Sequence, residues 1–568
     1  MQLAIDTELS GLDWRRDTFY GLGMCTGTSE AWFEQVVNKK LPDGEQIYFN
    51  APFDYKVLKF RGVRNLKIDH DVQIQAALLG RNGMGLEDLA VHHANFKEWK
   101  VKGVYDKARC LMDVKATLAL HNRQIKELAK EGLLNVYNNY SMPFCRMIAD
   151  MEYGGIRVDV DKLREYSMKF AAQAAVEAKG FEAVCCDGIA VVSKALFDKS
   201  IAKVKKESAK QARIDSPGKY KLNFNINSGQ QLLQLFEYYG IKPTDMDGKP
   251  TTDQRILYPL EFKYGEVKQL LAYRKQENAA KRSREWLELL DGDRLYPSYN
   301  LGKVVTGRLS CSRPNIQQTP SHGVGRELRE CILPDVGDTW VIVDVSQIEP
   351  RLAAHFSKDQ NLIDVFVKGE DLYGIVAKRI FGLDCTSKQV KELYNEQRQL
   401  AKKCTLASIF YGQGEESLAF TLQAEGYEVT EDDCLIFKQE FFKMFPTLKR
   451  YKDKLAEEAS SRGYVTGIFG QKVWVPAREA GHKPFNYKMQ HSASVMNCRA
   501  QLQIQKACKE YAKLKALIHD EDLYSCRPDK TKDLKGLLQI YMVKQWEFKL
   551  AVPMCVEIFE GDTWGIKK

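Results

Sequence analysis

The chain has 568 residues, of which 44% are hydrophobic and 28% charged, so it is too long for one ordinary core and too apolar for a disordered protein. No apolar run reaches the roughly 18 residues that cross a bilayer, and no signal peptide pattern opens the chain, which argues against membrane and secreted proteins and favours the cytoplasm. The 14 cysteines include no CxxC pair, which argues against a zinc-finger protein. The net charge of +9 suits a polyanionic partner, because Lys and Arg that neutralise phosphates release counterions.

In chain order, the first region predicts alternating strands and helices up to about residue 135. Residues 2–5 and 46–50 are expected to be strands, and residues 72–79 and 111–120 helices. Residues 134–153 carry apolar side chains at helical spacing and end at two glycines, which predicts a long helix leading into a second domain.

The rest of the chain is predicted to form a helical region, a β-rich region, a second helical region and a mixed end: residues 156–290, 291–360, 361–460 and 460–568. The basic segment 203–221 lacks apolar periodicity and is expected to be an exposed loop. For the wider segment 183–222, a solvent loop is preferred over a partner-binding insertion.

Four acids in the first region predict a metal site. Asp6 and Glu8 alternate along the first strand and therefore face the same side, while Asp54 and Asp113 add two more carboxylates. Four inward acids need a cation, because like charges and burial both oppose ionisation. Oxygen ligands suit Mg²⁺ or Mn²⁺. The alternative is that Asp6 caps a strand end and Asp54 caps a helix.

A second acid pair lies far apart in the chain. Residues 340–345 form a β-branched run typical of a buried strand, with Asp344 near its end. Residues 517–524 predict strand, tight turn and strand, with Asp520 at the turn. Two such acids on adjacent strands could hold two Mg²⁺ ions about 4 Å apart, the arrangement of in-line nucleotidyl transfer.

Between these acids the sequence predicts a cationic helix. Thr386 and Gln389 form a capping box, and the helix is expected to continue through residue 406. Arg398, Lys402 and Leu406 are spaced by four and share one face, so they could grip a triphosphate and cover a base. A solvated basic helix is the alternative.

Together these segments resemble family A DNA polymerases, and the N-terminal acids resemble those of DEDD 3′→5′ exonucleases. The matching segments are TGRLS at 306–310, PNIQ at 314–317, DVSQIEPR at 344–351, the RxxxK helix ending in YG at 411–412, GYVT at 463–466, FG at 469–470, NYKMQ at 486–490, HDE at 519–521, and the tail with GDTW at 561–564. Asp71 also fits the exonuclease layout.

The resemblance implies a ribonuclease H-like α/β exonuclease domain at 1–135 and a right-hand α+β polymerase domain at 136–568. Within the latter, the thumb is expected at about 136–290, the palm at about 291–360 and 486–568, and the fingers at about 361–485. Its implied partners are primer–template DNA and dNTPs, and its implied cofactor is Mg²⁺, two ions per active site, with Mn²⁺ as a substitute.

Residue roles carried by the resemblance fall into four sets. The catalytic residues are Asp344, Asp520 and Glu521 for synthesis and Asp6, Glu8, Asp54 and Asp113 for degradation. The metal ligands are the same acids without Glu521, together with the Val345 carbonyl. The residues expected to bind the dNTP are Arg398, Lys402, Leu406, Glu349, Gln347, Phe410 and Tyr411, and those expected to contact DNA are Arg308, Asn486, Gln490, His519 and Arg351. Glu349 is expected to crowd the 2′ position and so favour deoxynucleotides.

Several positions depart from the family pattern. Arg109 stands where the exonucleases carry Tyr or His, with Tyr105 one helical turn earlier as a substitute. Val345 replaces a Tyr, and Leu406 replaces an aromatic residue. Counting from Lys402, the family's Tyr falls on Phe410, whereas the Tyr-Gly ending points to residue 411. Asp371-Leu372-Tyr373 replaces Asp-Ile-His.

Two rivals share these motifs: an exonuclease with an inactive polymerase half, and a non-enzymatic DNA-binding scaffold. Single-subunit RNA polymerases share the hand, but Glu349 in its SQIE context favours DNA synthesis. Because Asp6 lies so near the start, we expect no 5′-nuclease domain and a phage-type replicase, located in the host cytoplasm if viral. Helicase, single-strand-binding or processivity partners are not identified by the sequence.

Overall fold

A five-stranded mixed sheet forms the centre of the N-terminal module in the computed structural model, which describes residues 1–100, 105–216, 224–245, 247–544, 546 and 549–566. The strands lie in the order β3-β2-β1-β4-β5, namely Glu30–Phe33, Phe19–Cys25, Gln2–Leu9, Glu45–Tyr48 and His70–Asp71. Strand β1 is antiparallel to β2 and parallel to β4. The same module contains the helices α1 (Ala51–Phe60), α2 (Val72–Leu78), α3 (Leu86–Ala94) and α4 (Lys107–Lys130).

Strand β1 is longer than the sequence predicts. It was expected to end at residue 5, but its pairing with β2 continues past Asp6 and Glu8 to Leu9. The acids therefore lie within the strand, where the alternation of side chains is imposed by the sheet. This makes their common orientation a property of the backbone.

The predicted long helix that follows the module is interrupted. A short helix α5 (Leu134–Val136) passes through a π-helical turn (Tyr137–Ser141) into α6 (Met142–Gly154), and Gly155 ends it with φ 60°. Pro143 in the first turn of α6 has no N–H to donate, which interrupts the α-helical ladder there. The glycine stop is confirmed, because only glycine adopts this backbone region without strain.

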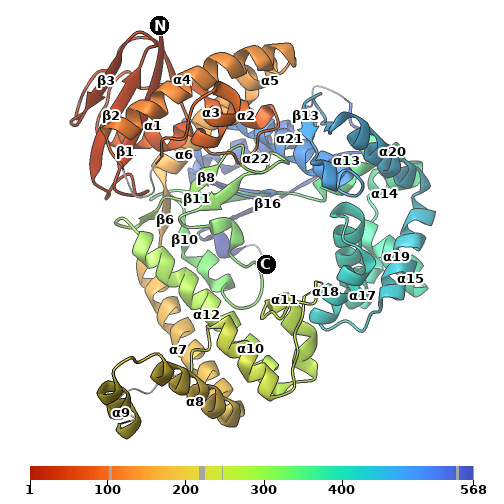
Figure 1. The fold of residues 1–568 in the computed structure, drawn as a ribbon. Helices are drawn as coiled ribbons and strands as arrows, with labels where there is room; N and C mark the ends of the chain where they lie inside the picture. Colours follow the sequence, from red (N-terminus) through yellow and green to blue (C-terminus); the bar gives the residue numbers. More distant parts are fainter. Residues whose placement is uncertain (101–104, 217–223, 246, 545, 547–548, 567–568) are drawn as a thin grey trace.

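Two long helices, α7 (Val160–Val184) and α12 (Gly265–Leu289), lie side by side and carry a separate small core at their far end (Figure 1). That end is completed by α8 (Cys186–Ala202), α9 (Glu207–Asp215), α10 (Gly229–Tyr238) and α11 (Gln254–Leu257).

The loop expected at 203–221 is wrong for residues 207–215, which form helix α9 without a buried residue, while 217–221 lie outside the described residues. High helix propensity of its Lys, Glu, Ala and Gln residues accounts for this without any apolar stripe. The wider solvent loop is also wrong for α8, where Ile189, Val192 and Leu196 pack against the small core.

A four-stranded antiparallel sheet lies at the centre of the larger module, in the order β14-β15-β11-β16. Its strands are Ala512–Ile518, Glu521–Cys526, Thr339–Val345 and Val556–Gly561, and helices α21 (Pro484–Cys508) and α22 (Thr531–Gln539) pack on it. The predicted strand around 340–345 and the strand-turn-strand at 517–524 are confirmed. Val341, Ile342 and Val343 are fully buried.

Smaller elements frame this sheet. Two short sheets have the orders β10-β6-β7 (Ile332–Leu333, Ile156–Val158, Arg294–Leu295) and β8-β9 (Ser298–Asn300, Ser310–Ser312).

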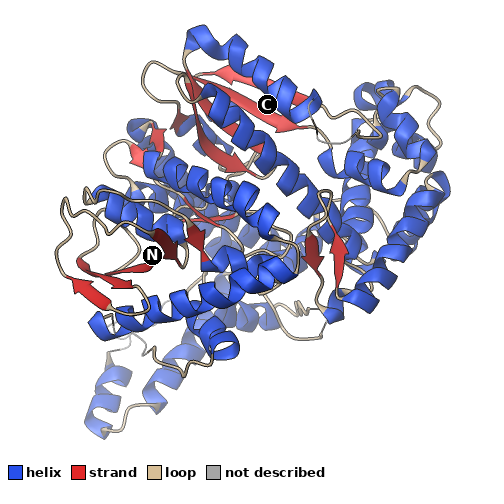
Figure 2. Ribbon diagram, turned by 90° about the horizontal axis from the view of Figure 1, so that it is seen from above, coloured by secondary structure: helices blue, strands red, loops and turns tan. Residues whose placement is uncertain are grey.

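A helical layer faces the α7–α12 pair across the central sheet (Figures 1 and 2). It contains α13 (Ile348–Ser357), α14 (Gln360–Val367), α15 (Leu372–Phe381), α16 (Ser387–Leu393), α17 (Asn395–Cys404), α18 (Glu415–Ala424), α19 (Glu431–Met444) and α20 (Pro446–Arg462), followed by the hairpin β12 (Tyr464–Thr466) and β13 (Lys472–Trp474). None of the helices in the described ranges is both long and apolar enough to span a membrane.

The capping box of Thr386 and Gln389 is confirmed, but the helix it begins does not run to residue 406. Tyr394 leaves the helical region with φ −136° and ψ 47°, and α17 begins anew at Asn395. Arg398 and Lys402 therefore belong to a separate helix.

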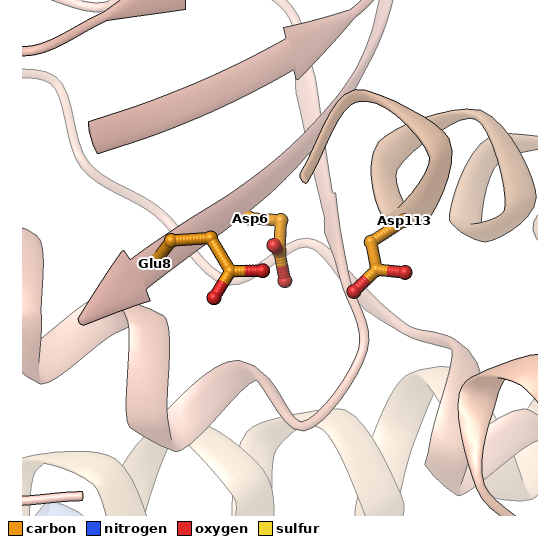
Figure 3. Close-up of side chains that lie close together, drawn as sticks. All are labelled: Asp6, Glu8 and Asp113. Atoms are coloured by element: carbon orange, nitrogen blue, oxygen red, sulfur yellow. The ribbon is translucent and has the colours of Figure 1, made fainter. Parts of the chain in front are cut away.

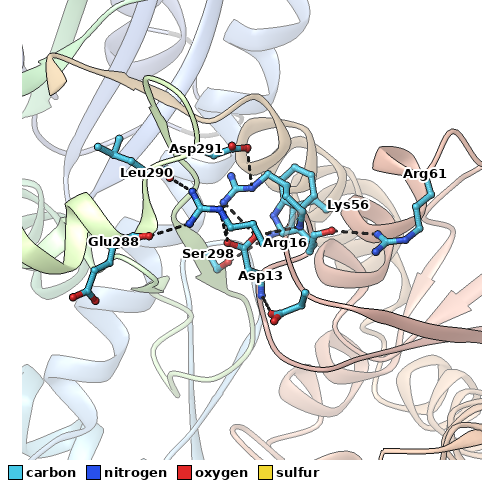
Figure 4. A network of polar contacts seen from close by, with 11 residues as sticks. Asp13, Arg16, Lys56, Arg61, Glu288, Leu290, Asp291 and Ser298 are labelled. Carbon is cyan, nitrogen blue, oxygen red and sulfur yellow. Dashed lines mark hydrogen bonds and ion pairs between the residues drawn. The ribbon is translucent and has the colours of Figure 1, made fainter.

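Polar contacts join the two modules (Figure 4). Arg16 donates to the carbonyls of Glu288 and Leu290 at the end of α12, and Lys56 on α1 forms an ion pair with Glu152 on α6. Lys56 and Glu152 are both almost fully buried, and one hydrophobic core runs through both modules. A buried pair that loses one partner leaves an uncompensated charge, so this contact ties α1 to the larger module.

Candidate functional sites

Three carboxylates converge in the N-terminal module (Figure 3). Asp6 and Glu8 project from β1 and Asp113 from α4, and one ligand oxygen from each lies within 4.8 Å of the others. Glu8 and Asp113 are buried. Three hard oxygen donors at this spacing could hold Mg²⁺ or Mn²⁺.

The fourth predicted acid, Asp54, is beside this triad but bound differently. Its Oδ1 accepts hydrogen bonds from the Thr7 amide at 2.9 Å and the Thr7 hydroxyl at 2.6 Å. Its charge still raises the pKa of Asp6, so the two carboxyls are close. The N-cap of α1 is Asn50, so Asp54 does not cap the helix as the alternative suggested.

Asp71 has a structural role in this geometry. Its carboxylate accepts from the amides of Gln73, Ile74 and Ala51, at 2.8, 3.1 and 2.7 Å. It thereby caps α2 and ties that helix to the start of α1.

Burial and mutual repulsion raise the pKa values of the triad. Desolvation raises the pKa of Asp6 well above its usual range, followed by the charges of Asp54, Asp113 and Glu8. Desolvation also raises the pKa of Glu8 to about 7 and that of Asp54 to about 7, against the lowering effects of Arg109 and of Thr7 respectively. A divalent cation would relieve this repulsion.

Two residues that contact the triad were not predicted from the sequence. The Trp99 indole donates to Asp113 Oδ1 at 2.8 Å, and the Lys100 ammonium lies 3.1 Å from Asp113 Oδ2. Both follow α3 in a segment without periodicity, so no sequence pattern linked them to Asp113.

Arg109 forms an ion pair with one acid of the triad. Its Nε lies 3.4 Å from Glu8 Oε1, and its guanidinium stacks 4.5 Å from the ring centre of Tyr105. Tyr105 is 47% exposed. The described contacts of its ring are thus with Arg109 rather than with a carboxylate.

The central sheet brings Asp344 and Asp520 to one end. Asp344 pairs with Glu521 across β11 and β15, and the Val345 amide donates to the Asp520 carbonyl at 3.1 Å. His519 adopts φ 58° in the tight turn that carries Asp520. The predicted adjacency of the two acids is therefore observed in the backbone register.

The Glu521 carboxylate is bound by donors from other parts of the chain. Its Oε1 accepts from the Trp564 indole at 2.5 Å and lies 3.4 Å from Arg329. The next residue, Asp522, was missed: it is fully buried and accepts from Gln501 at 2.9 Å. Desolvation raises its pKa to about 7. Both acids are therefore held by partners on other segments, directly after the turn that carries Asp520.

Next to these acids lies a second group of predicted residues. Glu349 is buried, pairs with Arg308, and has a pKa raised to about 7 by desolvation, with Asp520 adding repulsion. Gln347, at φ 53°, forms the left-handed turn between β11 and α13. A cavity of about 40 Å³ is lined by Arg308, His519 and Asp520 among others.

Two cations of α17 lie near the ring of Tyr373. The Arg398 guanidinium and the Lys402 ammonium lie 5.8 and 5.9 Å from the ring centre of Tyr373. Arg398 also forms a two-point ion pair with Asp371, with one contact at 3.2 Å. Lys402 is exposed and Leu406 half-buried.

The ambiguity between Phe410 and Tyr411 has a structural cause. Residues Thr405–Phe410 form a π-helical turn, in which the Tyr411 amide donates to Leu406, five residues back, at 2.8 Å. A π turn accommodates one extra residue, so counting by α-helical spacing fails here. Phe410 is buried against Phe485, whereas Tyr411 is 43% exposed and lies near Glu349 and Arg308.

The remaining predicted residues divide into two groups. Asn486 is buried and Gln490 half-buried at the start of α21. Arg351 donates to the carbonyls of Ser346 at 3.0 Å and Pro553 at 2.5 Å, and stacks on Phe366. These contacts favour a structural role for Arg351 over the DNA contact expected from the sequence.

An antiparallel sheet with paired acids, set between two helical arms, defines the right-hand class of polymerase folds. The chain belongs to DNA polymerase family A, whose sequence profile matches residues 193–566.

Individual relatives agree with this assignment. DNA polymerase I of Chloroflexus aurantiacus is 28% identical over 92% of this chain and 55% of its own length, and the thermostable DNA polymerase I of Thermus thermophilus is 27% identical over 90% and 57%. The chain thus spans little more than half the length of these relatives. The POL domain of Pol1 from M. smegmatis, solved with DNA primer-template and dNTP, has a TM-score of 0.80 at 22% identity, covering 100% of this chain and 95% of that one.

Proposed function

We propose that this chain extends a primer 3′ end by template-directed addition of dNTPs. The observation that carries the proposal is the placement of Asp344 and Asp520 at one end of adjacent strands, in a chain of family A. The primer-template and dNTP bound to the M. smegmatis neighbour support the same substrates here.

In this proposal residues 136–568 form the polymerase hand. The α7–α12 pair and its tip are the thumb (about 136–290), the central sheet is the palm (about 291–360 and 486–568), and the helices α14 to α20 belong to the fingers (about 361–485). Residues 1–135 form a ribonuclease H-like exonuclease domain, supported by the mixed sheet and the acid triad.

Both acidic sites suit Mg²⁺. Asp344, Asp520 and the Val345 carbonyl would hold it at the palm, and Asp6, Glu8 and Asp113, with Asp54 beside them, at the N-terminal site. When bound, Mg²⁺ lowers the pKa of a coordinated hydroxyl or water and neutralises charge on phosphate. The raised pKa values of the N-terminal acids fit a site that is built for a cation.

The nucleotide would lie between α17 and the palm. Arg398 and Lys402 would neutralise the triphosphate, where charge develops as pyrophosphate leaves. Arg398 must exchange its Asp371 partner for phosphate, which makes dNTP binding a competition between two anions. Glu349 and Tyr411 would face the sugar.

The DNA would lie against the opposite side of the palm acids. Arg308, Asn486, Gln490 and His519 would contact backbone and minor-groove atoms, so that every sequence can be copied. Arg308 is shared, since it also neutralises Glu349.

A second activity, 3′→5′ degradation, is favoured by the triad. Arg109 against Glu8 replaces the water-orienting Tyr or His of the resembling exonucleases. The guanidinium could instead neutralise the scissile phosphate, which would preserve cleavage but alter its pH dependence.

Primer extension on a primed template tests both activities. We compare wild type, Asp344→Ala and Asp6→Ala with Mg²⁺, with and without dNTPs. Extension by wild type and Asp6→Ala, with only degradation by Asp344→Ala, supports both sites. A wild type that degrades but never extends points to an exonuclease with an inactive hand, and binding without either reaction points to a scaffold.

A further inference from the structure

A half-buried lysine, Lys452, lies at the end of the helical segment that carries Arg398 and Lys402. Lys452 projects from α20, and its ammonium donates a hydrogen bond to the Ile409 carbonyl. That carbonyl belongs to the last turn of the helix, where no intrahelical donor follows. A cation at a helix C-terminus also complements the negative end of the helix dipole.

Two aromatic rings lie close to the Lys452 ammonium. The rings of Phe485 and Phe442 lie 4.8 and 5.7 Å from its ammonium, and within the described part of the chain no carboxylate comes within ion-pair distance of it. Burial lowers the pKa of Lys452 to about 7, with the nearby Lys438 adding a smaller effect in the same direction. An ammonium so placed is costly unless its hydrogen bond is retained.

The bond acts at the π-helical turn. Ile409 is followed by Phe410, which is buried against Phe485, and by Tyr411, which is exposed beside Glu349 and Arg308. The Phe485 ring therefore contacts both the Lys452 ammonium and Phe410. A shift of the Ile409 carbonyl would rotate the two residues after it together.

We propose that Lys452 is a positioning residue that holds the π-helical turn so that Tyr411, and not Phe410, faces the incoming nucleotide. The inference rests on the proposed polymerase function. It makes Lys452 a determinant of dNTP affinity and sugar choice, although it lies behind the helix and touches no substrate.

Single-nucleotide incorporation on a primed template tests this with Lys452→Met, Lys452→Arg and the control Lys454→Met. Lys454 lies on the same helix with a side chain that is 68% exposed. Lys452→Met should raise the KM for dNTP about tenfold, because a displaced Tyr411 loses a contact with the nucleotide that the ground state and the transition state share. Its kcat should change far less, its preference for dCTP over rCTP should fall, and Arg should restore both.

A double-mutant cycle separates positioning from general stability. In a Tyr411→Ala background, Lys452→Met should have little further effect on the dNTP KM, because the residue through which it acts is gone. Additive effects in the cycle, or a Lys452→Met that matches Lys454→Met, overturn the inference. If Lys452→Met does not fold, Lys452→Gln, which keeps a donor without the charge, takes its place.

Failure of the proposed function gives a different result. If wild type incorporates no nucleotide, the polymerase proposal itself fails. If wild type incorporates normally and the Lys452 variants do too, only the role of Lys452 fails.

Discussion

The N-terminal acid site and the acid site of the central sheet differ in how their carboxylates are brought together. At the N-terminal site three carboxylates converge within 4.8 Å, and Trp99, Lys100 and Arg109 hold two of them. At the central sheet the backbone register brings Asp344 and Asp520 to one end of adjacent strands, while Glu521 is engaged by Trp564 and Arg329. The first site thus gathers three carboxylates from two elements. Under the proposed function, DNA and a nucleotide complete the second site.

This difference has a physical basis. A preformed acid cluster stores repulsion, visible in the raised pKa values of Asp6 and Glu8, and can bind a cation without substrate. A site completed by phosphate oxygens binds the cation tightly only when the substrate arrives. We expect selectivity for a correct nucleotide to benefit from the second arrangement.

The largest expected effect tests preformation directly. In the absence of DNA, Asp6→Asn should weaken Mn²⁺ binding about 100-fold or more, because a direct ligand is lost from a built site. Asp344→Asn should leave that binding unchanged. Electron paramagnetic resonance titration of free Mn²⁺ measures both. Asp364→Asn on α14 is the control, because the Asp364 side chain is 41% exposed and pairs with Lys368. Loss of DNA-free binding in Asp344→Asn would contradict the comparison.

A smaller effect is expected from the side chains that hold Asp113. Lys100→Met removes the ammonium 3.1 Å from Asp113 and should slow 3′→5′ degradation about 10- to 100-fold, as for other outer partners of metal ligands. Primer extension should not change. Single-turnover degradation without dNTPs is the measurement, and the exposed Lys97→Met is the matched control. Equal rates for the two variants would mean that Trp99 alone holds Asp113.

Much of the central site could be predicted from the sequence because its signals are local. The β-branched run ending in Asp344 and the turn at Asp520 each specify a strand end within a few residues. The capping box at Thr386 is equally local, and it is confirmed. The convergence of Asp6, Glu8 and Asp113 also followed from strand alternation and the exonuclease resemblance.

The missed features depend on contacts between distant segments. Trp99 and Lys100 reach Asp113 from a segment without periodicity, and Asp522 is satisfied by Gln501 on another element. The π turn before Tyr411 was visible only as a counting conflict, since helical spacing assumes a regular helix. The break at Tyr394 likewise has no local signal such as proline or glycine.

The smallest expected effect concerns pH and isolates the repulsion stored at the N-terminal site. Desolvation raises the pKa of Glu8 to about 7 from an ordinary value of 4.5, so between these pH values the folded chain binds more protons than the unfolded chain. The free energy of unfolding therefore falls as pH rises through this window, and the penalty is fully present above it. Glu8→Gln removes the penalty, and its melting temperature relative to wild type should rise by about 1–3 °C between pH 5 and pH 8.

The measurement is thermal unfolding in EDTA, which keeps divalent cations from cancelling the repulsion. The exposed Glu34→Gln should show no such trend, because a solvated carboxyl has no burial penalty to lose. Added Mn²⁺ should reverse the ranking at pH 8, since wild type then gains a ligand that the variant lacks. A Glu8→Gln difference that does not depend on pH would mean that Arg109 already neutralises Glu8, and the N-terminal site would then store no more repulsion than the central one.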